Sequence, residues 1–168
     1  MPFSSITVAI DPGRDGAIVG VDPDGVIQGY RLLGTGTESV QPLREFLSEH
    51  CCVVDEEVVI ERNASAPGQS VTSAFTQGEN YGILCGALRV LGWGLRTIEP
   101  SSWHKLVPKP KGPKYILSKR NIWDSAELAN PSVFRGLSRH KAQGLADAYY
   151  MALAEQSRRN PPTIDLRD

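Results

Sequence analysis

The chain has 168 residues, of which 40% are hydrophobic, which is enough for one well-buried domain and too little for two. Its net charge of -1 by itself argues for no partner, and its three cysteines show neither a CxxC pair nor a Cys/His ligand spacing, which argues against a disulfide framework and a zinc site. It contains no run of about 18 apolar residues and no signal-peptide pattern, so a soluble, cytoplasmic protein is expected.

The charges are distributed unevenly along the chain. Residues 1–61 contain 11 Asp and Glu against 3 Lys and Arg, whereas residues 62–168 contain 15 Lys and Arg against 8 Asp and Glu. Such asymmetry suits a protein that concentrates acids in one place and presents a basic surface to a polyanion elsewhere.

The first predicted strand covers residues 6–10 and leads into Asp11. Its apolar, β-branched run suits a strand that is covered on both faces. A carboxylate at the end of such a strand is a common place for a catalytic acid. Taken alone, however, Asp11 followed by Pro12 and Gly13 is good turn chemistry, and a surface turn is then the favoured interpretation.

Residues 16–21 and 26–33 predict two more strands, joined by a tight turn at residues 22–25. Three strands connected in this way form an antiparallel meander, which needs a helix or another sheet over its apolar face. A helix is predicted from Ser39, as its N-terminal cap, to about His50, because its apolar residues fall on one face.

The fourth predicted strand, residues 57–61, also ends on an acid, Glu61. A right-handed crossover through the preceding helix would place it parallel to the first strand, so that Asp11 and Glu61 finish at the same end of the sheet. Two carboxylates in a small volume repel each other unless a cation lies between them, so this pair implies a metal. The alternative is an ion pair of Glu61 with Arg62 or Arg14 at a sheet edge.

Residues 70–91 predict a long helix, and residues 93–98 a fifth strand. Gly78, Gly82 and Gly86 recur every four residues in the helix, at a cost of about 1 kcal/mol each relative to alanine. A closely packed neighbouring helix, which a second subunit could supply, is the favoured explanation. The other explanation is nucleic-acid backbone that lies against the start of the helix.

A basic segment with interleaved aromatic residues follows the fifth strand. Residues 101–122 contain no acid and six fixed positive charges, together with Trp103, His104 and Tyr115. The Pro-Lys-Pro-Lys-Gly-Pro run at residues 108–113 predicts an extended, exposed loop. These features favour a surface that contacts phosphates over a loop that only keeps the protein soluble.

Residues 115–128 predict a further helix, and the last helix runs from about residue 140 to residue 158. On this last helix Gln143, Gly144 and Asp147 share a face with His140, because steps of three, four and seven residues return to the same side. Asp147 has small apolar neighbours, where an acid needs a cation or a hydrogen-bond donor.

The chain is expected to form a single domain over residues 1–160, followed by a flexible tail at residues 161–168. Four short motifs in this domain occur in the order found in a known family: Ala9-Ile10-Asp11-Pro12-Gly13 with Gly16 following, Val59-Ile60-Glu61, Pro100-Ser101-Ser102-Trp103 ahead of a lysine-rich loop, and Gly144-Leu145-Ala146-Asp147-Ala148. Together they make the chain similar to RuvC-type Holliday junction resolvases, nearest to the small phage-borne branch.

This resemblance covers roughly residues 5–158 and implies an α/β, RNase H-like fold, in which a mixed five-stranded sheet (three antiparallel strands, then parallel strands) is flanked by helices. It also implies a homodimer that acts on branched DNA in recombination and repair, as a crossover junction endodeoxyribonuclease. Members of the family gather about four acidic or histidine side chains around divalent metal. By position, the resemblance assigns Asp11, Glu61 and Asp147 to three of these places.

The fourth place is where the chain departs from its relatives, which have Asp or His three or four residues before Asp147. Here those positions are Gly144 and Gln143. His140 is the candidate replacement, and Gln143 could hold a metal more weakly through its amide oxygen.

The resemblance and the residues together imply hydrolysis with two Mg²⁺ ions, which Mn²⁺ could replace. Asp11 would bridge both ions, Glu61 and Asp147 would each favour one, and His140 would bind metal or orient the attacking water. The expected products are paired, symmetric nicks in a four-way junction. The basic residues expected to bind DNA are Arg14, Arg62, Lys105, Lys109, Lys111, Lys114, Lys119, Arg139 and Lys141.

Two other functions stay open. A catalytically weak or inactive branched-DNA-binding protein of the same fold would bind junctions without metal-dependent nicks. A phosphate binder of the sugar-kinase or chaperone type would use residues 11–16 as a phosphate turn, but it would require a second, equivalent domain, for which 168 residues leave no room.

Overall fold

The computed structural model describes residues 6–50, 57–62, 68–108 and 119–160. The elements in these ranges are β1 (Thr7–Asp11), β2 (Ala17–Val21), β3 (Ile27–Leu32), a 3-10 turn η1 (Gly36–Ser39), α1 (Val40–His50), β4 (Glu57–Glu61), α2 (Val71–Val90), β5 (Gly94–Ile98), α3 (Pro100–His104), α4 (Lys119–Ala129), α5 (Pro131–Phe134) and α6 (Arg139–Arg159). No helix within these ranges is long and apolar enough to cross a lipid bilayer. The expected tail at residues 161–168 lies outside them.

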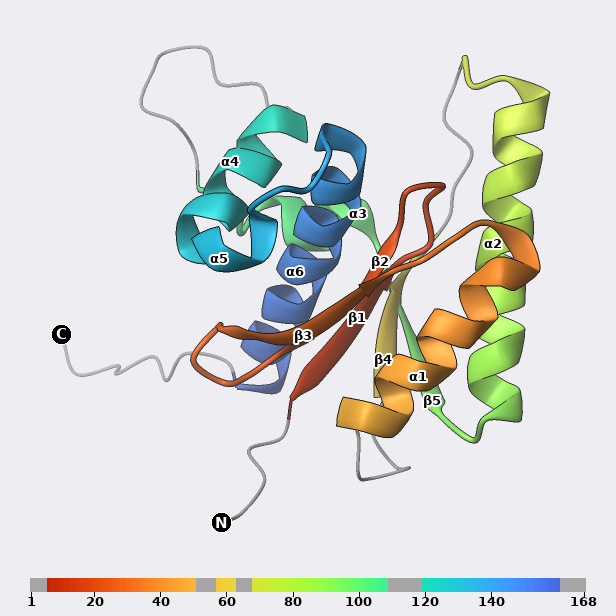
Figure 1. Cartoon of the computed structure of the whole chain (residues 1–168), viewed down its shortest axis with the longest axis horizontal. Coiled ribbons are helices and arrows are strands. Elements are labelled where there is room, and N and C mark those ends of the chain that lie inside the picture. Colours follow the sequence, from red (N-terminus) through yellow and green to blue (C-terminus); the bar gives the residue numbers. More distant parts are fainter. Residues whose placement is uncertain (1–5, 51–56, 63–67, 109–118, 161–168) are drawn as a thin grey trace, which may run out of the picture.

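The five strands form one mixed sheet in the order β3-β2-β1-β4-β5 (Figure 1). β2 pairs antiparallel with both β1 and β3, which gives the predicted meander. β4 lies parallel to β1, with Ile10 opposite Ile60, and β5 lies parallel to β4. The predicted mixed five-stranded sheet is therefore confirmed.

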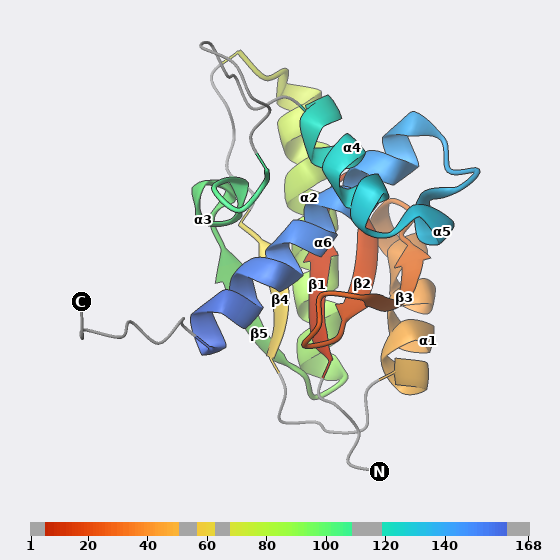
Figure 2. The ribbon, with the colours of Figure 1, turned by 90° about the vertical axis from the view of Figure 1, so that its left-hand side faces the viewer.

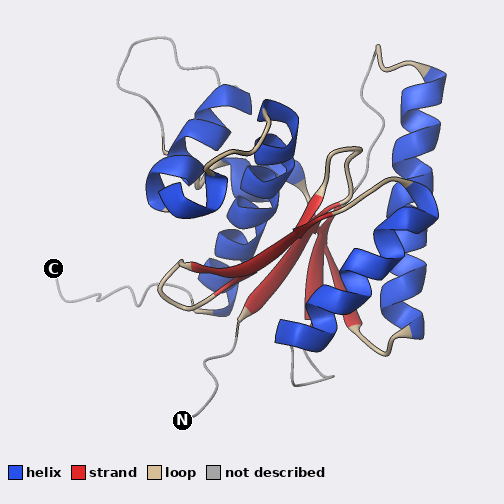
Figure 3. Ribbon diagram, viewed as in Figure 1, coloured by secondary structure: helices blue, strands red, loops and turns tan. Residues whose placement is uncertain are grey.

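Helices cover both faces of the sheet (Figures 1 and 3). α1 and α2 pack on one face, and α3, α4, α5 and α6 lie on the other, where α6 crosses the strands (Figure 2). Alternate strand residues divide between the two sides, because side chains along a strand point to opposite faces. In β1, Val8 and Ile10 join the core under α1 and α2, whereas Ala9 joins the core under α6.

The helices differ from the prediction in two respects. α3 and α5 were not predicted, because helices of five and four residues are too short to show a helical period in the sequence. The prediction of Ser39 as the N-cap of α1 is wrong, because its hydroxyl donates instead to the Gly36 carbonyl oxygen, at 2.7 Å, inside the 3-10 turn. Ser70 does cap α2, since its hydroxyl oxygen accepts the Ser73 N–H at 3.2 Å.

One face of α2 has no neighbour among the described residues. A Cβ atom on Gly78, Gly82 or Gly86 would meet no atom within 4 Å. On the same helix, Val71 and Phe75 are 87% and 72% exposed. The closely packed helix expected beside these glycines is therefore not another described helix of this chain.

Candidate active site

Asp11 and Glu61 end two adjacent parallel strands on the same side of the sheet. Each residue comes directly after the paired Ile10 and Ile60, and the backbones of adjacent strands lie about 4.8 Å apart. Asp11 and Glu61 come two residues after Ala9 and Val59, which belong to the core under α6. Residues two apart on a strand point to the same face, so both acid side chains lie on the α6 side. The structure thus places the two acids at the same end of two inner strands and on one face of the sheet.

The turn after β1 positions the Asp11 carboxylate. The Gly13 N–H donates to Asp11 Oδ1 at 2.9 Å, a charge-assisted hydrogen bond. Gly16 closes the turn by donating its N–H to the Gly13 carbonyl oxygen at 3.0 Å. A Cβ atom on Gly16 would overlap the Asp11 carbonyl oxygen, so the tight turn that directs Asp11 requires glycine there.

A buried tryptophan holds the Glu61 carboxylate. Trp103, on α3, is 2% exposed, and its indole N–H donates to Glu61 Oε2 at 2.9 Å. The His104 ring packs edge-on against the indole, with 4.1 Å between the ring centroids. Burial lowers the pKa of His104 below its usual value, which keeps this histidine neutral at pH 7. The donor that orients Glu61, the Trp103 indole, is itself neutral, and so is the histidine packed against it.

Asp147 lies on α6, and Gln143 one turn earlier binds it. The Gln143 side-chain amide donates to Asp147 Oδ1 at 2.7 Å. Both side chains are half-buried. Because Gln143 donates through its nitrogen, its amide oxygen can still accept a hydrogen bond or bind a cation.

Gly144 is the residue of α6 that touches the turn after β1. A Cβ atom at this position would overlap the Asp15 carbonyl oxygen and would lie 3.0 Å from Asp11 Oδ2. Backbone atoms in a tight turn give way less easily than a side chain does. Neither an acid nor a histidine fits at residue 144 unless the turn changes, which is a steric reason for the missing fourth acid.

His140, the candidate replacement, lies in the first turn of α6 and is exposed. It precedes Asp147 by seven residues, about 10 Å along the helix axis. Its role as a metal ligand, or as the group that orients the attacking water, stays a prediction.

Three carboxylates are a donor set that suits a hard cation such as Mg²⁺. Within the described ranges, however, no three Asp, Glu, His or Cys side chains lie close enough together to hold a metal ion. Glu61 is engaged by Trp103, and Asp147 by Gln143. The acids thus fit a divalent cation by their chemistry, and their side chains would have to close around it.

Five of the basic residues expected to bind DNA have described side chains, and all are exposed: Arg14, Arg62, Lys105, Arg139 and Lys141. Arg62 forms an ion pair with Glu99, with 3.0 Å between Nη1 and Oε1. Lys119 is the first residue of α4. Three lysines of the basic loop lie outside the described residues: Lys109, Lys111 and Lys114.

Trp103 and Gly144 contact the acids in ways that the sequence did not predict. Both belong to motifs that carry the family resemblance, which is the signal that could have drawn attention to them. The hydrogen bond from Trp103 joins residues 42 positions apart, and the Gly144 contact joins a helix to a distant turn. A single sequence contains no local pattern that predicts contacts between residues so far apart in the chain.

The strand order, the helices on both faces and the acids at one edge of the sheet define an RNase H-like fold. Two similar solved structures place this fold more closely: Thermus thermophilus RuvC in complex with a Holliday junction substrate (TM-score 0.63), and a second structure of Thermus thermophilus RuvC (TM-score 0.62). Each is 16% identical to this chain and covers 92% of it, and the match covers 96% of the RuvC chain. No family model and no curated protein matches the sequence. The RuvC-like fold implied by the four motifs is confirmed, and the assignment to the phage-borne branch stays a prediction.

Proposed function

We propose that the protein is a metal-dependent, structure-selective DNA endonuclease that resolves four-way junctions by paired symmetric nicks. One observation carries the proposal: within a RuvC-like fold, Asp11 and Glu61 end adjacent parallel strands beneath α6, which bears Asp147. Metal-dependent phosphodiester hydrolysis needs such a concentration of carboxylates. The RuvC structure that contains a Holliday junction supports branched DNA as the substrate class.

The three acids would hold one or two divalent cations, Mg²⁺ or Mn²⁺, which when bound supply Lewis-acid activation of water and of the leaving oxygen. The protein's own contribution is orientation. Trp103 donates to one oxygen of Glu61, and Gln143 donates to one oxygen of Asp147, and these two hydrogen bonds fix how each carboxylate is oriented. His140 would complete the donor set or orient the attacking water.

The exposed cations near the acids supply the proposed DNA contacts. Arg14 lies in the turn directly after Asp11, and Arg139 and Lys141 lie in the first turn of α6. Contacts to phosphates provide affinity and position the substrate without reading its sequence. They fit an enzyme that selects branched shape, and the lysines of the basic loop are proposed to extend the same surface.

We also propose that two chains pair through the open face of α2. This face carries Val71, Phe75 and three glycines, around which the described part of the chain leaves open space. Exposed apolar side chains that lie together on one element indicate an interaction surface. A two-fold dimer would present two sites to the two strands that must be cut in a four-way junction.

The test is incubation of the purified protein with a synthetic four-way junction or with linear duplex DNA of the same sequence, with Mg²⁺ or with chelator. The wild-type protein should nick the junction symmetrically, and only when metal is present. Asp11→Asn should abolish nicking but keep junction binding, because it removes a carboxylate and no cation. Asp24→Asn is the matched control, since Asp24 is an exposed acid in the turn between β2 and β3.

Equal cleavage of linear duplex, or full activity in Asp11→Asn, would refute the proposal. A second candidate function, a junction-binding protein without nuclease activity, is favoured by the steric exclusion of an acid at residue 144. It predicts tight binding to the junction and no nicks with either Mg²⁺ or Mn²⁺. The same experiment therefore separates the two functions.

A further inference from the structure

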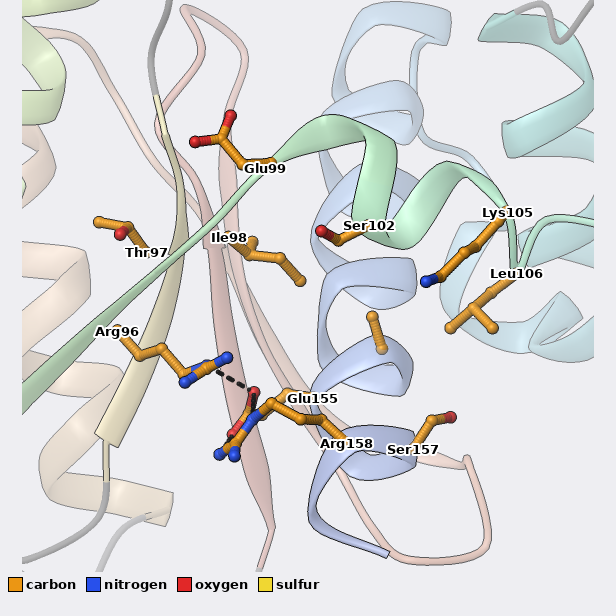
Figure 4. A pocket seen from close by; sticks show the side chains of 11 residues that line it. Arg96, Thr97, Ile98, Glu99, Ser102, Lys105, Leu106, Glu155, Ser157 and Arg158 are labelled. Atoms are coloured by element: carbon orange, nitrogen blue, oxygen red, sulfur yellow. Dashed lines mark hydrogen bonds and ion pairs between the residues drawn. The ribbon is translucent and has the colours of Figure 1, made fainter. Parts of the chain in front are cut away.

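A cleft of about 430 Å³ lies between β5, α3 and the last turns of α6 (Figure 4). Charged residues from three parts of the fold line it: Arg96 from β5, Lys105 directly after α3, and Glu155 and Arg158 from α6. In Figure 4 the Arg96 guanidinium and the Lys105 amine both point into the space between these elements. The lining of this cleft contains none of the three acids of the candidate site and none of the lysines of the basic loop.

A buried carboxylate gathers three guanidinium groups at one end of the cleft. Glu155 is 1% exposed, and it accepts hydrogen bonds from Arg158 at 2.9 and 2.6 Å and from Arg159 at 2.9 Å. Arg96 Nε lies 2.9 Å from Glu155 Oε2, as an ion pair without hydrogen-bond alignment. Burial raises the pKa of Glu155, but the hydrogen bonds from Arg158 and Arg159 and the charge of Arg96 outweigh it and hold the pKa below its usual value. At neutral pH the Glu155 carboxylate is therefore charged and pairs with three arginines, of which Arg96 and Arg158 line the cleft, while Glu57 also lies close enough to act on the charge of Arg158.

The excess of cations continues along the cleft. Lys105 is exposed on the opposite wall, and none of the ion pairs between described residues involves it. The other acid of the lining, Glu99, is already paired with Arg62. A network that only fastened α6 to β5 would need one arginine for one carboxylate. The cleft lining holds three cations, Arg96, Lys105 and Arg158, against the two acids Glu99 and Glu155, and this excess favours an anion.

Glu155 also fixes the head groups of the arginines that bind it. The side chains of Arg96 and Arg158 remain 36% and 48% exposed in these ion pairs, so their other N–H groups can still donate to an anion. Donors that are held in place beforehand lose less conformational entropy on binding. The hydroxyl group of Ser102 also lines the cleft and adds a neutral donor.

The cleft begins beside the candidate active site and leads away from it. Ile98, in the lining, is the β5 residue that pairs with Glu61. At 1.5 Å per residue, Arg158 lies about 16 Å along α6 from Asp147. That length corresponds to roughly five base-pair steps of 3.4 Å.

From this arrangement we propose that the cleft binds the phosphate backbone of one DNA arm, about five base pairs from the nicked phosphate. The inference rests on the proposed junction-resolving function and adds a contact to it. A phosphate held at this distance fixes the direction in which the arm leaves the active site, because backbone contacts set position and orientation.

The first test measures junction binding over a range of salt concentrations, without divalent metal, for wild-type protein, Lys105→Gln and Arg158→Gln. Each variant should reduce the slope of log binding constant against log salt concentration by about 0.9, the value for one phosphate contact. Arg44→Gln, which removes an exposed arginine of α1 on the other side of the sheet, should leave the slope unchanged. Lys105→Gln disturbs no described ion pair, so it keeps the test valid if Arg158→Gln unfolds.

The second test locates the contact by replacing single phosphates with neutral methylphosphonates. Wild-type binding should weaken most at about five base pairs from the nick, and Arg158→Gln should have lost that sensitivity. Unchanged slopes in both cleft variants would refute DNA binding by the cleft and would leave the proposed function intact. A wild-type protein without preference for junctions would overturn the proposed function, and the slopes for linear duplex would then still decide whether the cleft binds DNA.

Discussion

Two of the three acids of the candidate site accept hydrogen bonds from neutral nitrogen donors, Glu61 from Trp103 and Asp147 from Gln143. A neutral donor orients a carboxylate without cancelling its charge. An arginine or lysine in the same place would neutralise the acid and compete with a metal ion. These two hydrogen bonds are therefore compatible with the proposed use of both acids as metal ligands.

Replacing Trp103 by phenylalanine should weaken metal binding while keeping the fold. Trp103→Phe retains an aromatic ring in the buried site but removes the N–H that orients Glu61, together with part of the indole volume. Loss of such an outer partner costs about 10- to 100-fold in metal affinity or activity. The measurement is the Mg²⁺ or Mn²⁺ concentration needed for half-maximal nicking, together with metal binding by calorimetry.

Trp93→Phe is the matched control, because Trp93 is half-buried against the core under α2 and away from α3. It should leave the metal dependence unchanged. If both variants show the same metal dependence as wild type, Trp103 has only a packing role.

Gly144→Ala should destabilise the protein by about 1–3 kcal/mol, the cost of overpacking, because the added methyl group overlaps the Asp15 carbonyl oxygen. Urea unfolding measures the free energy of unfolding. Gly78→Ala is the comparison, with both substitutions made in a Phe75→Glu background that removes the proposed α2 dimer contact. It makes the same change in a helix where the described residues leave open space around the glycine, and alanine there should be neutral or stabilising. Equal effects of the two substitutions would contradict the steric role of Gly144.

At the scale of the elements, α2 contributes a buried face to the core and a second, open face. Leu84 and Leu88 pack under the sheet, whereas Phe75 is 72% exposed on the same helix. Phe75→Glu should therefore convert a dimer into a monomer. The two strands of a junction should then be nicked independently and no longer as a pair. Light scattering after size-exclusion chromatography reports the mass.

Val26→Glu is the control for this prediction, because Val26 is an exposed apolar residue in the turn between β2 and β3. It should leave the mass unchanged. A wild-type protein that is monomeric at all concentrations tested would refute the α2 interface.

Most of the sheet could be predicted from the sequence, because its determinants are local. The β-branched runs that end at Asp11 and Glu61 marked β1 and β4, and the turn at residues 22–25 marked the meander. A single helix between β3 and β4 predicted that the two acids finish at the same edge. Alternation along the strands then decides which side of the sheet each acid occupies.

The remaining parts of the site depend on contacts between distant segments. The sequence offered Ser39 as a helix cap, but the chain forms a 3-10 turn there and uses the hydroxyl within it. α3 is too short for its period to be visible, so the donor that it supplies to Glu61 could not be anticipated. The use of Gly144 for close packing is likewise invisible until α6 and the turn after β1 are placed together.

At the scale of the whole molecule, the Glu155 network joins the last helix to the edge strand β5. Glu155→Gln should lower the free energy of unfolding by about 1–3 kcal/mol at neutral pH, because it removes the buried carboxylate that accepts charged hydrogen bonds from partly exposed arginines. The same variant should retain junction binding if the cleft cations act mainly through their charge. Chemical denaturation and junction binding measure the two effects.

The pKa of Glu155 is lowered in the folded protein, so its stabilising effect is present above the ordinary glutamate pKa of about 4.3 and is lost as the pH falls through the lower, folded value. The difference in free energy of unfolding between wild type and Glu155→Gln should therefore be constant near pH 7 and should shrink below about pH 4. A difference that does not depend on pH would show that the carboxylate charge is not what stabilises the fold.

The contact between Gly144 and the turn after β1 also bears on how this protein could evolve. A single substitution that introduced an acid at residue 144 would clash with the Asp15 carbonyl oxygen before it could supply a ligand. The turn would have to change first, or at the same time. Residue 144 and residues 12–16 should therefore vary together between descendants of a common ancestor, as two positions whose substitutions are tolerated only in combination.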